Sequence, residues 1–298
     1  MPATRLPDSE LIVNPDGSVY HLGLRPGDVP PLIVTVGDPE RVDAVARRFA
    51  AVEQTVQRRE FRTVVGRFAG RRIACVSTGI GTDNVDIVLN ELDALVNVDF
   101  ATRIPRARPR RLTFVRLGTS GTFQPDIEVD ALLVSAEAVG LDGLGPHYRF
   151  RENRLAADLT EGFPAYAKTA YAAAGTSQLV AAWEDAGAVR GATLTCAGFY
   201  GPQRRSVRLP FAGPTLPELA AFRSGGQRLT NFEMETAGIY GLADLLGHRA
   251  VSVSAILANR GLGTFSSSPG ATVDRLLDQA FALFSAELAV WWDETSEG

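Results

Sequence analysis

The feature that most constrains this fold is the alternation of short β-branched apolar runs with amphipathic, helix-forming stretches. Residues 31–36, PLIVTV, are one such run and predict a buried strand. Asp38 can cap a following helix, and Pro39 suits the first helical position. Strands that alternate with helices predict an α/β fold in three layers, with helices on both faces of a central sheet.

The same patterns predict the remaining elements of a single domain. Further strands are expected at residues 61–68, 72–77, 112–117, 131–139, 192–197 and 251–257. Helices are expected from Asp83, twice within 154–188, over 232–246 and over 272–292. No linker-like segment divides these elements, so residues 1–298 are interpreted as one domain, with 1–19 as an irregular N-terminal extension.

Charge and cysteine content limit the partners and the location of the protein. The formal net charge of −4 gives no positive field for nucleic acid, although residues 103–111 form an arginine-rich, solvated loop. Only Cys75 and Cys196 are present, which indicates a reducing compartment without a disulfide framework. No signal pattern and no apolar run of about 18 residues occur. We expect a cytoplasmic protein that binds neither membrane nor nucleic acid.

Lysine is almost absent, and this excludes two common classes of enzyme. Lys168 is the single lysine among 30 basic residues, and it lies in the small-residue stretch Ala165-Tyr166-Ala167. A Walker phosphate loop needs Gly-Lys-Ser/Thr, and a pyridoxal enzyme needs a Schiff-base lysine. Lys168 has neither context. If the protein handles phosphate, arginine must bind it.

Polar residues gather where the predicted strands end, which is where open α/β sheets bind ligands. Arg116 interrupts an apolar strand, and a buried arginine needs an anionic partner. It precedes Gly118-Thr119-Ser120-Gly121, interpreted as a closing turn, whose glycines and Thr119 hydroxyl could approach an anion. Arg41 lies in the first turn of a helix, where negative charge is favoured. Arg116 could instead pair with a structural carboxylate. Taken together, these residues predict an oxyanion pocket.

Two further clusters carry hydrogen-bonding chemistry. Glu233 and Glu235 flank Met234 at the predicted start of a helix. A carboxylate there could accept hydrogen bonds from two vicinal hydroxyls, or could merely complement the helix dipole. The segment 199–205, FYGPQRR, offers an aromatic face, an amide and a guanidinium, which together suit the polar edge of a pyrimidine-like ring.

These motifs occur in an order that resembles one known family. The matching segments are 34–41 (VTVGDPER), 59–61 (REF), 77–81 (STGIG), 116–121 (RLGTSG), 199–205, 233–235 (EME) and 259–260 (NR). The set resembles the hexameric-type nucleoside phosphorylase family, and within it the uridine-cleaving branch, from about Tyr20 to the last helix. The resemblance implies a mixed, barrel-like sheet and a pentosyltransferase that cleaves uridine, and deoxyuridine, with inorganic phosphate into uracil and (deoxy)ribose 1-phosphate.

The resemblance also implies roles for particular residues. Phosphate would be held by Gly37, Arg41, Arg116 and Thr119, with Arg59 from the neighbouring subunit; ribose by Met234 and Glu235, with His21 from the neighbouring subunit; and the base by Phe199, Gln203 and Arg205, with Arg260 nearby in an unassigned role. It implies no cofactor beyond phosphate as co-substrate, and a homo-oligomer of dimers with shared sites, the hexamer favoured. It assigns no metal-binding residue in this chain: Thr82-Asp83-Asn84 departs from the potassium site of some members, which leaves a potassium ion possible but unsupported.

Three alternatives remain open at this stage. The first is a purine nucleoside phosphorylase. In its favour, Gly201-Pro202 is reversed relative to a common bacterial uridine-cleaving pattern, and helix residues 235–240 look more like purine-cleaving relatives. Those relatives place an aspartate near the end of the strand written here as 256–260, where this chain has none. A nucleosidase that uses water would have no use for Arg41, Arg59 and Arg116 around phosphate. A non-catalytic nucleoside-binding protein is the third alternative.

Overall fold

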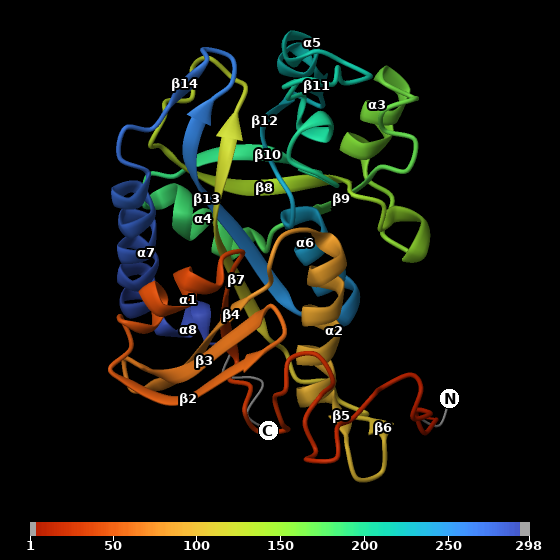
Figure 1. Cartoon of the computed structure of the whole chain (residues 1–298), viewed down its shortest axis with the longest axis vertical. Coiled ribbons are helices and arrows are strands. Elements are labelled where there is room, and N and C mark those ends of the chain that lie inside the picture. Colours follow the sequence, from red (N-terminus) through yellow and green to blue (C-terminus); the bar gives the residue numbers. More distant parts are fainter. Residues whose placement is uncertain (1–3, 293–298) are drawn as a thin grey trace.

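The structure is a computed structural model that describes residues 4–292. A mixed sheet of twelve strands forms the centre of the molecule (Figure 1). Its strands are β1 (Leu32–Val36), β2 (Ala51–Arg58), β3 (Phe61–Phe68), β4 (Arg71–Ser77), β7 (Thr113–Thr122), β8 (Leu132–Leu141), β9 (Tyr171–Ala174), β10 (Val189–Cys196), β11 (Arg223–Ser224), β12 (Gln227–Glu233), β13 (Arg249–Asn259) and β14 (Thr264–Phe265). β5 (Val98–Asp99) and β6 (Ile104–Pro105) form a separate pair.

The sheet closes on itself, which makes it barrel-like as expected. Its order is β11-β12-β10-β8-β13-β7-β1-β4-β3-β2, and β12 also pairs with β7. That extra pairing joins β12, β10, β8, β13 and β7 into a ring. The closing contact is antiparallel and joins Asn231 to Thr122 and Phe232 to Gly121. The carboxyl end of β12 therefore lies against the carboxyl end of β7.

Helices cover both faces of the sheet, so the three-layer prediction is confirmed. They are α1 (Pro39–Ala46), α2 (Thr82–Asn97), α3 (Arg154–Gly162), α4 (Ser177–Asp185), α5 (Leu216–Ala221), α6 (Thr236–Leu246), α7 (Pro269–Ala286) and α8 (Leu288–Trp291), with short 3-10 turns at Gly145–His147 and Gly201–Gln203. One apolar core packs α1, α4, α7 and α8 against the sheet, and another packs α2 and α6 (Figure 1). No helix in the described part of the chain is long and apolar enough to cross a membrane.

The first predicted strand and helix are confirmed. β1 is buried at every residue, and Asp38 caps α1 by accepting a hydrogen bond from the backbone N–H of Glu40. β2 was not predicted, because its outward side chains leave no apolar period in the sequence. β9 was wrongly included in a helical region. Its four residues are alanine-rich, but the chain here adds to the edge of β8.

Three boundary predictions were wrong, and in the first two sheet pairing overrides local preference. Gly118-Thr119-Ser120-Gly121 is not a turn, because β7 runs through it to Thr122 and pairs with β13 throughout. Residues 232 and 233 belong to β12 and not to a helix, so α6 starts at Thr236. The last predicted helix is broken after Ala286, where Glu287 leaves the helical conformation.

The N-terminal segment is fastened by an arginine that the sequence placed in a solvated loop. Residues 4–31 contain turns and one isolated bridge between Val13 and Val19. Arg103 is 8% exposed, and its guanidinium donates to the carbonyl oxygens of Leu6, Pro7 and Leu11. For Arg103 the solvated interpretation was wrong, since its side chain replaces water with these carbonyls.

Candidate functional site

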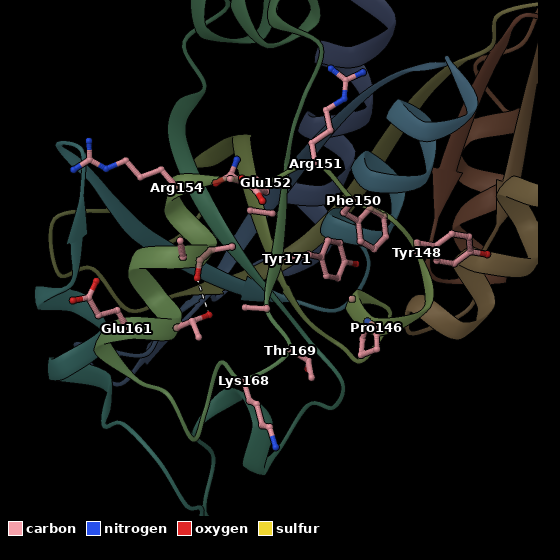
Figure 2. A pocket seen from close by; sticks show the side chains of 17 residues that line it. Pro146, Tyr148, Phe150, Arg151, Glu152, Arg154, Glu161, Lys168, Thr169 and Tyr171 are labelled. Atoms are coloured by element: carbon pink, nitrogen blue, oxygen red, sulfur yellow. Dashed lines mark hydrogen bonds between the residues drawn. The ribbon is translucent and has the colours of Figure 1, made fainter.

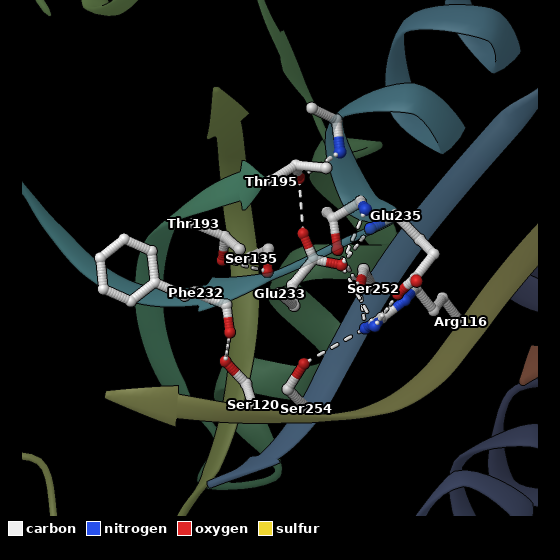
Figure 3. A network of polar contacts seen from close by, with 12 residues as sticks. Arg116, Ser120, Ser135, Thr193, Thr195, Phe232, Glu233, Glu235, Ser252 and Ser254 are labelled. Atoms are coloured by element: carbon white, nitrogen blue, oxygen red, sulfur yellow. Dashed lines mark hydrogen bonds and ion pairs between the residues drawn. The ribbon is translucent and has the colours of Figure 1, made fainter. Parts of the chain in front are cut away.

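Arg116 is the centre of a buried network of polar contacts (Figure 3), which we call the candidate anion pocket after the prediction from the sequence. Its guanidinium Nη2 lies 2.6 Å from Oε2 of Glu235 and 3.1 Å from Oε2 of Glu233. Its Nη1 donates to the hydroxyls of Ser252 and Ser254, each at 3.3 Å. Burial acts to lower the pKa of Arg116, but the two carboxylates outweigh it and raise that pKa. The need for an anionic partner, inferred from the sequence, is therefore met by two acids.

Glu233 is held as firmly as any carboxylate in the protein. One of its oxygens accepts the Thr195 hydroxyl. The other accepts the backbone N–H groups of Glu235 and Thr236, each at 2.8 Å, in addition to Arg116. Glu233 thus satisfies the first N–H groups of α6 from the end of β12, so both its strand position and its partners indicate a supporting role.

Glu235 lies between the ring and the turn that precedes α2. Its Oε1 accepts the backbone N–H of Gly81 at 2.8 Å, and its Oε2 faces Arg116. The φ of +102° at Gly81 is a conformation that favours glycine. Burial raises the pKa of Glu235, and the charge of Glu233 adds to this, while Arg116 opposes it. Glu235 is a carboxylate whose charge depends on its arginine.

A second guanidinium approaches the same pocket from α1. Arg41 donates to the carbonyl of Leu117 at 3.4 Å, and no carboxylate in the described chain forms an ion pair with it. Burial lowers the pKa of Arg41, and repulsion by Arg116 lowers it further. Because Arg41 has no carboxylate partner in the described chain, its guanidinium is the one left to bind an anion beside Arg116.

Glycines leave space beside Arg116 and beside the turn that contains Gly79. The predicted phosphate contacts of Gly37 and Thr119 are not tested by the structure. A Cβ at Gly118 would overlap the guanidinium of Arg116, and one at Gly37 would lie 3.4 Å from the carbonyl of Gly79. Thr119 is half-buried on β7, and its side chain makes no hydrogen bond with the described residues. Met234 is also half-buried, between the two glutamates. The roles of Gly37, Thr119 and Met234 remain predictions.

The predicted base-binding residues form a second cluster, in the loop after β10. Nη1 of Arg205 donates to the amide oxygen of Gln203 at 2.7 Å, and the guanidinium lies 3.7 Å from the centre of the Phe199 ring. Arg260 donates to the carbonyls of Gln203 and Arg204 at 2.7 and 3.0 Å. Burial, helped by the charge of Arg260, lowers the pKa of Arg205 to about 10. The unassigned Arg260 therefore supports the loop that carries Gln203.

Asn259 bears on the purine alternative, because it occupies the strand end where purine-cleaving relatives carry an aspartate. Its amide donates to the carbonyls of Gln124 and Ile127 at 3.0 and 2.9 Å, and its side chain is buried. These contacts commit Asn259 to the fold and leave it no free hydrogen-bond donor.

His21 and Arg59, predicted to serve a neighbouring subunit, lie together elsewhere on the same chain. Both contact Tyr20: Arg59 lies 4.9 Å from the centre of its ring, and the His21 ring packs edge-on at 4.9 Å. Nδ1 of His21 is 2.6 Å from the carboxylate of Glu91, so its Nε2 is left for another partner. Within residues 4–292, neither side chain forms a hydrogen bond or ion pair with Arg41, Arg116 or Glu235.

Several supporting residues were missed by the sequence analysis. Ser252 and Ser254 alternate with valines in β13, and this period of two could have placed both hydroxyls on one face. Thr195 and Glu91 gave no such signal, because their partners lie far away in the sequence. Among the described residues no group of three or more His, Cys, Asp or Glu side chains is arranged to hold a metal ion.

One cavity in the described part of the chain lies away from this pocket. Its volume is about 1020 Å³, and it is lined by residues around α3 and β9, including Lys168 (Figure 2). Its arginines are engaged locally: Arg151 pairs with Asp244 and Arg154 with Asp158. The cavity therefore lacks the buried, convergent polar groups that surround Arg116.

A closed mixed sheet with paired arginines and carboxylates inside it defines an α/β protein that binds a small polar ligand together with an anion. The chain belongs to the phosphorylase superfamily, whose sequence model matches residues 31–288. It is similar to the uridine phosphorylase of Thermococcus kodakarensis, with 31% identity over 95% of this chain and 90% of that one. It is also similar to the uridine phosphorylase of Klebsiella aerogenes, with 32% identity over 81% and 86%.

A solved structure agrees with this assignment. The nucleoside phosphorylase of Trypanosoma brucei, described as showing uridine phosphorylase activity, superimposes with a TM-score of 0.84 and 26% identity. The match covers 93% of this chain and 99% of that one. The resemblance inferred from the ordered motifs is therefore confirmed, as is the fold.

Proposed function

We propose that the protein cleaves uridine, and deoxyuridine, with inorganic phosphate into uracil and (deoxy)ribose 1-phosphate. The observation that carries this proposal is the contact between Arg116 and Glu235, with Arg41 close by. An anion held by the two arginines would lie next to a carboxylate able to accept the ribose hydroxyls. The relatives named uridine phosphorylase support the choice of substrate.

The chemistry follows from where charge develops. The bond between C1′ and the base nitrogen breaks, its electron pair leaves with the base, and a phosphate oxygen bonds to C1′. A phosphate held by Arg41 and Arg116 opposes the positive charge that builds on the sugar and makes the step effectively unimolecular. Gln203 and Arg205 would stabilise the negative charge on the departing uracil by hydrogen bonds.

The proposal extends to the assembly, cofactors and location. His21 and Arg59 would complete the site of a partner subunit, because they share one cluster on Tyr20 and make no contact with the pocket of their own chain among the described residues. We infer a homo-oligomer of dimers, with a hexamer favoured, that needs no cofactor beyond phosphate as co-substrate. Both cysteines are buried and free, which supports a reducing, cytoplasmic location.

The test is the release of uracil from uridine with and without phosphate. Arg41→Met should raise the KM for phosphate about tenfold or more, because a charge-assisted contact is lost without unpairing a buried acid. Arg47→Met is the matched control, since Arg47 is exposed at the end of the same helix. Uracil release at an equal rate without phosphate would contradict the proposal. Faster cleavage of inosine than of uridine would favour the purine alternative.

A further inference from the structure

Arg204 has a role that neither the family match nor the proposed reaction assigns. It precedes Arg205 in the loop after β10, but it is only 6% exposed. Its guanidinium lies 4.4 Å from the centre of the Tyr166 ring and 5.1 Å from that of Phe211. It also donates to the carbonyls of Ala212 and Pro202. Two successive arginines thus differ in function: Arg205 contacts Gln203, and Arg204 contacts the protein behind the loop.

The backbone of Arg204 adopts a conformation that is unfavourable for a residue other than glycine, so its surroundings must stabilise it. Its φ of +62° lies in the left-handed region, which costs a residue other than glycine about 1 kcal/mol or more. Such a conformation persists only where its surroundings over-determine it. The stacked and hydrogen-bonded guanidinium holds this conformation together with a hydrogen bond from the backbone N–H of Arg204 to the carbonyl of Gly201 and one from the guanidinium of Arg260 to the carbonyl of Arg204.

The residues that follow the base-binding loop depend on the same contact. We call residues 206–214 the flap segment. Val207 and Leu209 in it are 79% and 81% exposed, so they contribute no packing. In the part of the chain that the structure describes, a single hydrogen bond joins the flap segment to other residues, and it runs from Arg204 to the carbonyl of Ala212. Without Arg204 the segment would lose this connection.

The same contact fixes the two residues assigned to the base. Arg260, which follows β13, donates to the carbonyls of Gln203 and Arg204. The guanidinium of Arg204 packs on the rings of Tyr166 and Phe211 and donates to the carbonyl of Ala212. The segment from Gln203 to Arg205 is therefore held from two directions. In this position Nη1 of Arg205 donates to the amide oxygen of Gln203.

We infer that Arg204 is a positioning residue, which fastens the flap segment and holds Gln203 and Arg205 ready for the base. This inference rests on the proposed function for its base-binding consequence, but the fastening itself does not depend on any substrate. Arg204 acts through its neighbours, so its loss should weaken recognition of the base and leave the anion pocket around Arg116 unchanged.

Three variants test the role. Arg204→Met removes the guanidinium and keeps the length of the side chain, while Arg204→Gly also relieves the left-handed backbone. Arg208→Met is the control, because Arg208 is an exposed arginine within the flap segment. Arg204→Met should raise the KM for uridine and the Kd for free uracil about tenfold, through lost charged hydrogen bonds and cation–π contacts. The KM for phosphate should stay within about twofold.

Limited trypsin digestion gives a readout without substrate. Arg204→Met should cleave faster after Arg205 and Arg208 than the wild type does, while Arg208→Met loses only its own site. Unchanged cleavage and unchanged uracil affinity in Arg204→Met would overturn the inference, and so would full rescue by Arg204→Gly, which would make the backbone the cause. If the wild type cleaves no uridine but Arg204→Met still loosens the flap segment, the proposed function fails and the fastening stands.

Discussion

At the scale of single residues, Arg116 determines the pocket because it contacts two carboxylates at once. A buried arginine in an apolar strand predicts an anionic partner, and this was foreseeable from the sequence. The identity of the partners was not, since they come from β12 and the start of α6. For Glu233, the structure agrees with the interpretation that this carboxylate complements the helix dipole, because Glu233 accepts the first N–H groups of α6.

We expect Glu235 to make the binding of nucleoside depend on pH. Its pKa is raised above the usual range by burial, so it gains a proton at a pH where an exposed glutamate would not. The protonated form loses acceptor strength for the ribose hydroxyls and its ion pair with Arg116. Affinity for uridine should therefore fall on acidification, by up to about tenfold per pH unit below that pKa.

Calorimetry with uridine in phosphate-free buffer measures this dependence without titrating phosphate itself. Glu235→Gln should bind uridine weakly at neutral pH and lose the acid dependence. Glu161→Gln, which changes an exposed carboxylate on α3 outside the proposed site, is the comparison. An acid dependence that persists in full in Glu235→Gln would assign it to another group.

At the scale of elements, β7 continues through Gly118-Thr119-Ser120-Gly121, so these glycines do not form a turn. Glycines in sequence predict turns, and here that prediction failed, because β7 keeps its pairing with β13 and gains β12 at its end. Closure of a ring depends on residues far apart in the chain, and no local pattern encodes it. The exposed edge strand β2 was missed for the opposite reason, as it has too little apolar patterning.

Gly118 and Gly121 offer a matched test of this strand. A Cβ at Gly118 would overlap the guanidinium of Arg116, whereas one at Gly121 would meet no atom closer than 3.6 Å. Gly118→Ala should displace Arg116, raise the KM for phosphate strongly and destabilise the fold by about 1–3 kcal/mol. Gly121→Ala should change the free energy of unfolding by less than about 1 kcal/mol.

Urea denaturation and phosphate saturation curves compare the two alanine variants directly. Equal effects from both would mean that the space beside Arg116 is not what requires glycine at position 118.

At the scale of the whole molecule, the order of short motifs along the chain predicted the family, the layers and most elements. Each motif could be recognised from its own residues, whereas the positions of the motifs relative to one another in space could not be predicted from the sequence. The cluster of Tyr20, His21 and Arg59 shows this limit. Their sequence positions suggest nothing about proximity, yet the N-terminal segment and the turn between β2 and β3 bring them together.

Complementation between two impaired variants, assayed at a phosphate concentration far below the KM of Arg41→Met, tests whether sites are shared. One variant carries Arg41→Met, with an intact donor cluster; the other carries His21→Ala and Arg59→Met, with an intact pocket. After subunit exchange, half of the dimers are mixed, and each mixed dimer contains one complete site, so about a quarter of wild-type activity should return. No recovery, despite exchange confirmed by native mass spectrometry, would indicate that each subunit builds its own site.

The seam between β7 and β12 has a consequence for specificity. It joins the strand that carries Arg116 to the strand that leads into Glu235 at the start of α6, while Gln203 and Arg205 lie in a loop after β10. In the proposed function, the groups at the sugar are therefore fixed by the closed sheet, and the groups at the base lie on a loop that can change separately. We expect new base preferences to be accessible by altering that loop alone, with Arg116 and Glu235 unchanged.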